Sequence, residues 1–251
     1  MLIGSDYSQS GMTLLVVGSD TGVGKTVFSG FFGRYLKSRG VSIHLTKPFC
    51  SGGRGDIEFL AKCGEVSEAE VNFWYDDEPV SPAAWELRSD EKVDFDGIFF
   101  SLKERADNDF YDVLLVEGVG GLLAPLSKSN TVASFAKMLG AQLIVVAHNR
   151  VGVVNHILLT IDSALSRGIS VACVVLMEQQ KQDASAVDNA ELIGIHLPEM
   201  ANFKGVFEFP WLGEEADNPE MVAINSKKAE KVLENIFYEV INPFFLNDSS
   251  N

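Results

Sequence analysis

Residues 18–26 of the chain read Gly-Ser-Asp-Thr-Gly-Val-Gly-Lys-Thr and directly follow a short apolar run at 13–18. A glycine-rich run between a strand and a helix lets backbone N–H groups face phosphate oxygens, and the helix N-terminus adds partial positive charge. In this pattern Lys25 would reach the outer phosphates of a nucleoside triphosphate, and Thr26 would place its hydroxyl on Mg²⁺. The flanking patterns favour such a phosphate loop over a glycine-rich turn that binds nothing.

The loop departs from common patterns at two positions. The usual motif has glycine where this chain has Ser19, and the glycine stands one residue earlier, at Gly18. ATPases of the ParA and MinD type carry a second lysine five residues before the loop lysine, and this chain has Asp20 there. The second difference favours a metabolic enzyme over a nucleotide-dependent switch or scaffold, which stays open as the non-enzymatic alternative.

Three further side chains stand where ligands would gather. Lys47 opens the run KPFCSG at the end of an expected strand, and Glu117 closes another expected strand. Ligands of open parallel sheets bind at the carboxyl ends of strands. Mg²⁺ prefers hard oxygen ligands, so Thr26, Asp56 and Glu117 are candidate metal ligands. The alternatives are a surface lysine for Lys47, a helix N-cap for Asp56 and a solvated carboxylate for Glu117.

Strand-like and helix-like patterns alternate along the chain, which predicts an α/β fold with a single domain. We expect a doubly wound, mostly parallel sheet with helices on both faces, as in P-loop nucleotide hydrolases. Strands are expected at 13–18, 41–47, 112–117, 142–147 and 170–177, and helices from about residue 24, over 154–165 and over 226–238. The acidic segment 65–96 is expected to form loops and short helices over one edge of the sheet.

Composition narrows the classes of partner and the location. The 251 residues carry a net charge of −15, which disfavours nucleic acid as a partner. No apolar run approaches the ~20 residues that span a membrane. Three cysteines without a C-x-x-C pair fit a reducing, cytoplasmic location. We expect residues 1–11 to be a disordered tail or an artefact of an overlong start of the sequence. Residues 12–245 are expected to form the domain, and residues 246–251 a polar C-terminal tail.

Together, the motifs resemble those of the dethiobiotin synthetase family. The matching segments occur in family order over about residues 14–220: GSDTGVGKT at 18–26, KPFCSG at 47–52, Asp56, PVSPAA at 79–84, VEGVGGLLAPL at 116–126, RVGVVNH at 150–156 and PWL at 210–212. The combination is far more specific than any single motif. A related P-loop ligase, similar to cobyrinate a,c-diamide synthase, is the competing enzyme class, but such ligases carry a glutaminase domain for which this chain has no room.

The resemblance implies a role for each matching position. Lys25 and Lys47 would be the catalytic lysines, and Thr26, Asp56 and Glu117 would surround Mg²⁺. The implied nucleotide-binding residues are Gly22, Val23, Gly24, Lys25, Thr26, Val27, Asp56, Glu117, Gly118, Val119, Gly120, Pro210, Trp211 and Leu212. The implied substrate-binding residues are Ser51, Gly120, Val151, Gly152 and Asn155, of which those at 150–155 would close the substrate site of the partner in a homodimer.

The implied reaction joins CO₂ to 7,8-diaminononanoate with ATP and Mg²⁺ and gives dethiobiotin, ADP and phosphate. It would proceed through a carbamate and a carbamic–phosphoric anhydride. Family members often have Glu where this chain has Gly22, and Asn-Asp where it has Met177 and Glu178. That Asn reads the adenine edge, whereas a thioether sulfur is a weak acceptor. We therefore expect weak discrimination among nucleotide bases.

Overall fold

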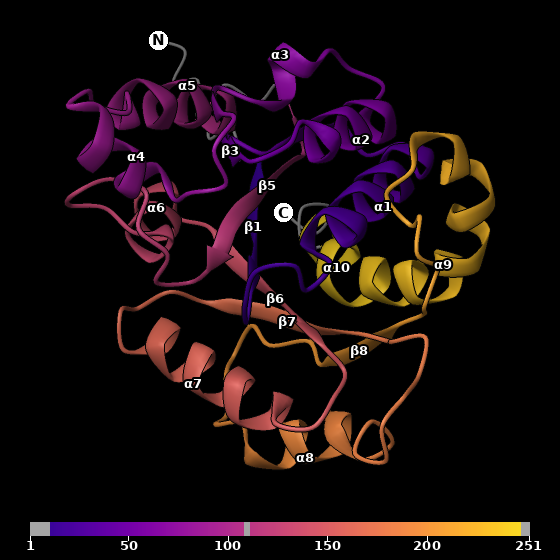
Figure 1. The fold of residues 1–251 in the computed structure, drawn as a ribbon. Helices are drawn as coiled ribbons and strands as arrows, with labels where there is room; N and C mark the ends of the chain where they lie inside the picture. Colours follow the sequence, from indigo (N-terminus) through magenta and orange to yellow (C-terminus); the bar gives the residue numbers. More distant parts are fainter. Residues whose placement is uncertain (1–10, 108–110, 247–251) are drawn as a thin grey trace, which may run out of the picture.

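A six-stranded parallel sheet forms the centre of the molecule (Figure 1). The computed structural model describes residues 11–107 and 111–246, so the predictions for the two tails lie almost wholly outside the described residues. The strand order is β2-β5-β1-β6-β7-β8. Their bounds are Met12–Gly18 for β1, Ile43–Thr46 for β2, Val113–Gly121 for β5, Gln142–His148 for β6, Val171–Met177 for β7 and Val206–Phe209 for β8. The assignment of 12–245 as one domain stays a prediction.

Helices cover both faces of this sheet, and the predicted fold class is thereby confirmed. Alternate residues of β1 enter opposite cores, because successive strand side chains point to opposite faces. One core includes side chains of α1 (Lys25–Ser38), α2 (Gly55–Gly64) and α9 (Val222–Ile236). The other includes side chains of α5 (Phe95–Asp107), α6 (Val132–Leu139), α7 (Val153–Leu165) and α8 (Asn189–His196). A strand buried on both faces is apolar throughout, which is why β1 reads as a continuous apolar run.

Helix α1 packs along the sheet and fixes the phosphate loop that precedes it. Phe28, Phe32 and Leu36 are fully buried at helical spacing, as the sequence pattern predicted. The rings of Phe28 and Phe32 stack with centroids 5.3 Å apart. The helix ends at Ser38, and Gly40 then turns the chain with a φ of 83°. Burial of this apolar face therefore holds the start of α1, and with it Lys25, against the end of β1.

The segment 65–96 contains more regular structure than the sequence predicted. The expected short helices are present as α3 (Glu68–Val71) and α4 (Pro82–Ser89). In addition, β3 (Phe49–Ser51) and β4 (Trp74–Asp76) pair in parallel as a separate two-stranded sheet. Strands of three residues are too short to show an alternating pattern, which explains why this pair was not expected. None of the described helices is long and apolar enough to cross a membrane.

The C-terminal region and several connecting helices also contain regular structure beyond what the sequence predicted. The closing helix begins at Val222, four residues before its expected start, and continues into a π-helical turn, Phe237–Ile241, and α10 (Asn242–Leu246). A single 3₁₀ turn, Pro219–Met221, precedes it. Strand β8 and helices α5, α6 and α8 were not predicted. Strand β2 is shorter than expected, so Lys47 lies just beyond its last residue.

Candidate active site

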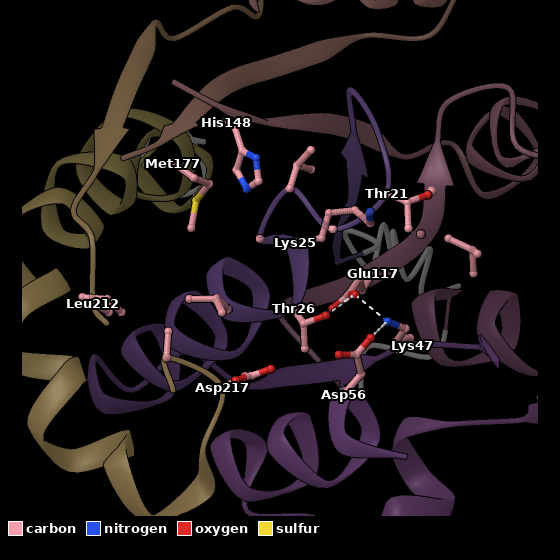
Figure 2. Close-up of a pocket in the computed structure, with 18 of the residues that line it drawn as sticks. Thr21, Lys25, Thr26, Lys47, Asp56, Glu117, His148, Met177, Leu212 and Asp217 are labelled. Carbon is pink, nitrogen blue, oxygen red and sulfur yellow. Dashed lines mark hydrogen bonds and ion pairs between the residues drawn. The ribbon is translucent and has the colours of Figure 1, made fainter. Parts of the chain in front are cut away.

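A cavity of about 490 Å³ opens at the carboxyl ends of the central strands, as expected for an open parallel sheet. It brings together most of the predicted site residues from the ends of β1, β2 and β5 and from the loop after β8 (Figure 2). The predicted residues that line it are Gly22, Val23, Gly24, Lys25, Thr26, Val27, Lys47, Ser51, Asp56, Glu117, Gly118, Val119, Gly120, Pro210, Trp211 and Leu212. Val151, Gly152 and Asn155 do not line it.

The phosphate loop explains why glycine stands at position 18. A side chain there would place its Cβ 2.3 Å from the carbonyl oxygen of Asp20 and 3.0 Å from Lys25 Nζ. Gly24 is the N-cap of α1 and has a φ of 94°, in the left-handed region that favours glycine. The glycine shifted by one residue thus serves the close approach of the loop to its own lysine.

Lys25 is held inside the loop. Its side chain is buried, and Nζ donates a hydrogen bond to the carbonyl oxygen of Asp20 at 3.3 Å. Burial lowers the pKa of Lys25 below its ordinary value, while the nearby Glu117 carboxylate acts in the opposite direction. A largely buried ammonium group interacts more strongly with anions than an exposed one, because the effective dielectric around it is lower. Lys25 is therefore placed to attract phosphate oxygens.

The centre of the cavity holds a compact cluster of four side chains, Thr26, Lys47, Asp56 and Glu117 (Figure 2). Glu117 Oε1 accepts hydrogen bonds from Thr26 Oγ1 at 2.8 Å and from Lys47 Nζ at 2.9 Å. Lys47 also forms an ion pair with Asp56, which lies in the first turn of α2. The first turns of α1 and α2, the residue after β2 and a residue within β5 thus converge on one charged cluster.

The members of this cluster differ in burial. Glu117 is completely buried, Lys47 is nearly so, and the Asp56 side chain is 38% exposed. Burial disfavours the charged form of Lys47, but Glu117 and Asp56 together raise its pKa above the ordinary value. Among the described residues, Glu117 Oε2 is one of few buried side-chain oxygens without a hydrogen-bond partner. A buried carboxylate oxygen left in this way is a site for a cation or a donor from a ligand.

The oxygen atoms of this cluster suit a hard divalent cation. No group of three or more His, Cys, Asp or Glu side chains within 11–107 and 111–246 is arranged to hold a metal ion. Mg²⁺, however, is commonly bound by one or two carboxylates together with waters and substrate phosphates. Thr26, Asp56 and Glu117 offer one hydroxyl and two carboxylates beside the phosphate loop. The residues therefore fit a metal that arrives with a nucleotide.

The far end of the cavity is lined by apolar side chains. Met177, at the end of β7, is nearly buried, and a Cβ on Gly24 would lie 3.0 Å from its Cε. Leu212 and the half-exposed Trp211 come from the loop after β8. Gln179 donates its amide hydrogens to the carbonyl oxygens of Met177 and Glu178. This end of the cavity thus combines apolar side chains with the polar Glu178 and Gln179.

His148 and Asp217 are among the cavity residues that sequence reasoning missed. His148 ends β6 and lines the cavity, and burial followed by the charge of Arg150 lowers its pKa. The rule that found Lys47, that ligands gather at carboxyl ends of strands, could have found it. Asp217 lies in the loop after β8, near Thr26 in Figure 2. No local pattern marks it, because its place in the cavity depends on the path of the loop after β8 in the assembled fold.

The segment 150–155 lies outside the cavity and is exposed at Val151, Gly152 and Asn155. Its conformation is nevertheless fixed by buried amides. Asn149 Nδ2 donates to the carbonyl oxygen of Ala186 at 3.1 Å, and Asn189 Nδ2 donates to Asn149 Oδ1 at 2.8 Å. Asn189 Nδ2 also donates to the carbonyl oxygen of Arg150 at 3.3 Å, so the beginning of this exposed segment is anchored before α7.

Comparisons with known proteins identify a matching family model and several similar sequences. The family model described as "AAA domain" matches residues 12–225. ATP-dependent dethiobiotin synthetase BioD of Methanococcus vannielii is 30% identical over 72% of this chain and 92% of its own length. The synthetase of Bacillus cereus strain AH820 is 31% identical over 88% of this chain and 94% of its own length. That of Bacillus thuringiensis is 33% identical over 72% and 78%, respectively.

A solved structure gives a more distant likeness. The signal recognition particle receptor FtsY from Elizabethkingia anophelis in complex with GDP has a TM-score of 0.49 and 13% identity, over 90% of this chain and 66% of that chain. This likeness supports no statement about function, so the assignment rests on the family model and the sequence relatives. They confirm the resemblance found in the motifs: the chain belongs to the AAA domain family and to the ATP-dependent dethiobiotin synthetase family.

Proposed function

We propose that this protein is an ATP-dependent ligase of biotin synthesis that converts 7,8-diaminononanoate and CO₂ to dethiobiotin. One observation carries the proposal: the phosphate loop and the cluster of Lys47, Asp56 and Glu117 meet in a single cavity, in a chain of this synthetase family. ATP would be the co-substrate, with its phosphates on the loop 22–27 and its base between Met177 and the segment 210–212.

Mg²⁺ would be held by Thr26, Asp56 and Glu117, whose oxygen atoms suit it. The unpartnered Glu117 Oε2 supports this assignment, because a buried carboxylate oxygen needs a partner. When bound, the ion supplies neutralisation of phosphate charge. The protein's own lysines, Lys25 and Lys47, add two positive charges beside it, and both are buried, where their attraction to oxyanions is strong.

The proposed reaction has three steps. One amine of the diamine attacks CO₂ and, after losing a proton, becomes a carbamate. A carbamate oxygen then takes the γ-phosphoryl group of ATP, which releases ADP. The second amine attacks the carbonyl carbon of this mixed anhydride, loses a proton, expels phosphate and closes the ureido ring. Lys25 and Lys47 would stabilise charge on the transferred group, while Ser51 and the turn at 118–120 would position the substrate.

The proposal includes a homodimer in which residues 150–155 of one subunit close the substrate site of the other. Val151 is 75% exposed, and Asn155 is exposed at the start of α7, so both are accessible to a second copy. The buried amides of Asn149 and Asn189 hold this segment in place. The proposal also includes a cytoplasmic location, where ATP is supplied and where three buried, unpaired cysteines would stay reduced.

Incorporation of labelled bicarbonate into product tests the proposal. The wild-type protein with ATP, Mg²⁺ and 7,8-diaminononanoate should form labelled dethiobiotin. Lys47→Ala should lower kcat by about a hundredfold or more, as loss of a group that stabilises transition-state charge does. Lys37→Ala is the matched control, because Lys37 pairs with the exposed Glu65 at 2.8 Å and does not line the cavity. Nucleotide hydrolysis without labelled product would favour the switch alternative instead.

A further inference from the structure

Lys47 occupies the position between the two carboxylates that the proposed metal would share. Its Nζ lies 2.9 Å from Glu117 Oε1 and also pairs with Asp56 (Figure 2). The same Glu117 oxygen accepts the hydroxyl hydrogen of Thr26. Thr26 is therefore engaged with Glu117, and both carboxylates are engaged with the same ammonium group, whereas Glu117 Oε2 has no hydrogen-bond partner.

Lys25, Lys47, Asp56 and Glu117 form a neutral set without a metal, while Asp217 and Glu214 line the same cavity outside this set and Asp20 acts on Lys25. Lys25 and Lys47 contribute two positive charges, and Asp56 and Glu117 contribute two negative charges. A divalent cation added to this set would face two ammonium groups, and repulsion is strong where Glu117 and both lysines are buried. The phosphates of a nucleotide would reverse that imbalance. They would also offer Lys25 and Lys47 new acceptors.

We propose that Lys47 acts as an internal counter-ion that holds the metal ligands in place in the free protein and is exchanged for the metal when nucleotide binds. The metal and Lys47 then compete for Asp56 and Glu117. The free protein binds divalent cations weakly, and the metal enters together with the nucleotide. This inference rests on the proposed magnesium site.

The two carboxylates that pair with Lys47 differ in how readily they can release its ammonium group. Glu117 lies within strand β5, which is paired on both sides by β2 and β1, and is fully buried. Asp56 lies on α2 with a side chain 38% exposed to the cavity side. A lysine has a flexible four-carbon stem, so its ammonium group can swing from Asp56 toward oxygens of the transferred group. The exchange thus moves Lys47 to where the proposed chemistry needs a positive charge.

Binding of Mn²⁺ to the protein without nucleotide, followed by electron paramagnetic resonance, tests the exchange. Mn²⁺ takes the same oxygen ligands as Mg²⁺. Lys47→Met and Lys47→Gln should each bind Mn²⁺ at least tenfold more tightly than wild type, because each removes the competing charge. Two variants are used in case one of them misfolds, and circular dichroism checks that each variant is folded. Lys37→Met removes a charge outside the cavity and should bind Mn²⁺ as wild type does.

A second substitution tests whether the gain in Mn²⁺ affinity comes from Glu117. Glu117→Gln, added to Lys47→Met, should abolish the tighter binding, because it removes the ligand that Lys47 had neutralised. In the wild-type protein, ADP should tighten Mn²⁺ binding by more than it does in Lys47→Met. Wild type that binds Mn²⁺ as tightly without ADP as with it overturns the counter-ion role.

The outcomes also separate this inference from the proposed function. If wild type binds Mn²⁺ with ADP while neither Lys47 variant gains affinity without it, the counter-ion role is wrong and the metal site stands. If no protein binds Mn²⁺ even with ADP, the proposed metal site is wrong, and the role of Lys47 is overturned with it.

Discussion

Acid should destabilise the protein through His44, a buried residue of the edge strand β2 that leads directly to Lys47. His44 is 3% exposed, and Arg105 Nη1 lies 2.7 Å from its Nε2. A guanidinium group can only donate hydrogen bonds, so Nε2 must accept, which requires the neutral ring. Burial, followed by the charge of Arg105, lowers the pKa of His44 from 6.5 to about 4.

The magnitude follows from this shift. The folded protein binds the proton less well than the unfolded chain, so the stabilising effect is complete above pH 6.5 and is lost as the pH falls toward 4. Each tenfold change in proton affinity is worth about 1.4 kcal/mol, so the full loss is roughly 3 kcal/mol. At pH 5 the loss should already be about 2 kcal/mol.

Urea denaturation of wild type and His44→Gln between pH 7 and 4.5 measures this effect. Gln keeps an oxygen acceptor for Arg105 but does not titrate, so its stability should fall less steeply over the same range. The wild-type protein should lose about 2 kcal/mol more than the variant between pH 7 and 5. Parallel stability curves for the two proteins would refute the reasoning. Loss of activity should accompany the wild-type transition, because β2 positions Lys47.

Three further predictions concern the base, the subunits and the segment that precedes α7. With Met177 in place of an adenine-reading Asn, GTP and CTP should support kcat/KM within about tenfold of ATP, and a thousandfold ATP preference would show that another group reads the base. Mixing Asn155→Ala with Lys47→Ala chains should restore activity, because one site of the heterodimer carries neither defect; no recovery after proven subunit exchange would place each site within one chain. Asn189→Leu should lower the free energy of unfolding in urea by about 1–3 kcal/mol, because it leaves Asn149 Oδ1 without its donor. The same variant should raise KM for the diamine more than KM for ATP. Equal changes in the two KM values would contradict a role for residues 150–155 at the substrate site.

The parts of the fold that could be predicted from sequence are those written in local patterns. Apolar runs such as 142–147 predicted buried strands, since a parallel strand covered on both faces is apolar throughout. The phosphate loop was found because its glycines, lysine and threonine are contiguous. Helix α8 was missed because its apolar side chains do not gather on one face, and only Ile193 among them is fully buried.

The sequence pointed to Lys47 and Glu117 because both were expected to close strands; Lys47 does lie just after β2, whereas β5 continues beyond Glu117 to Gly121. Asp217 and the amide pair of Asn149 and Asn189 could not be found in this way. The two asparagines are 40 residues apart, and only the packing of α8 beside the β6–α7 connection brings them together. Contacts of this kind depend on the assembled fold, so no recognisable spacing of residues in the sequence predicts them.

Phosphate release measured with and without each co-substrate tests the central claim most directly. The wild-type protein with ATP and Mg²⁺ should release phosphate rapidly only when 7,8-diaminononanoate and bicarbonate are both present, with one dethiobiotin formed per phosphate. That coupling is expected because the acceptor of the phosphoryl group is the carbamate, which forms only from those two compounds. Equal rates of phosphate release with and without the diamine would contradict the account and identify the protein as an ATPase of another kind.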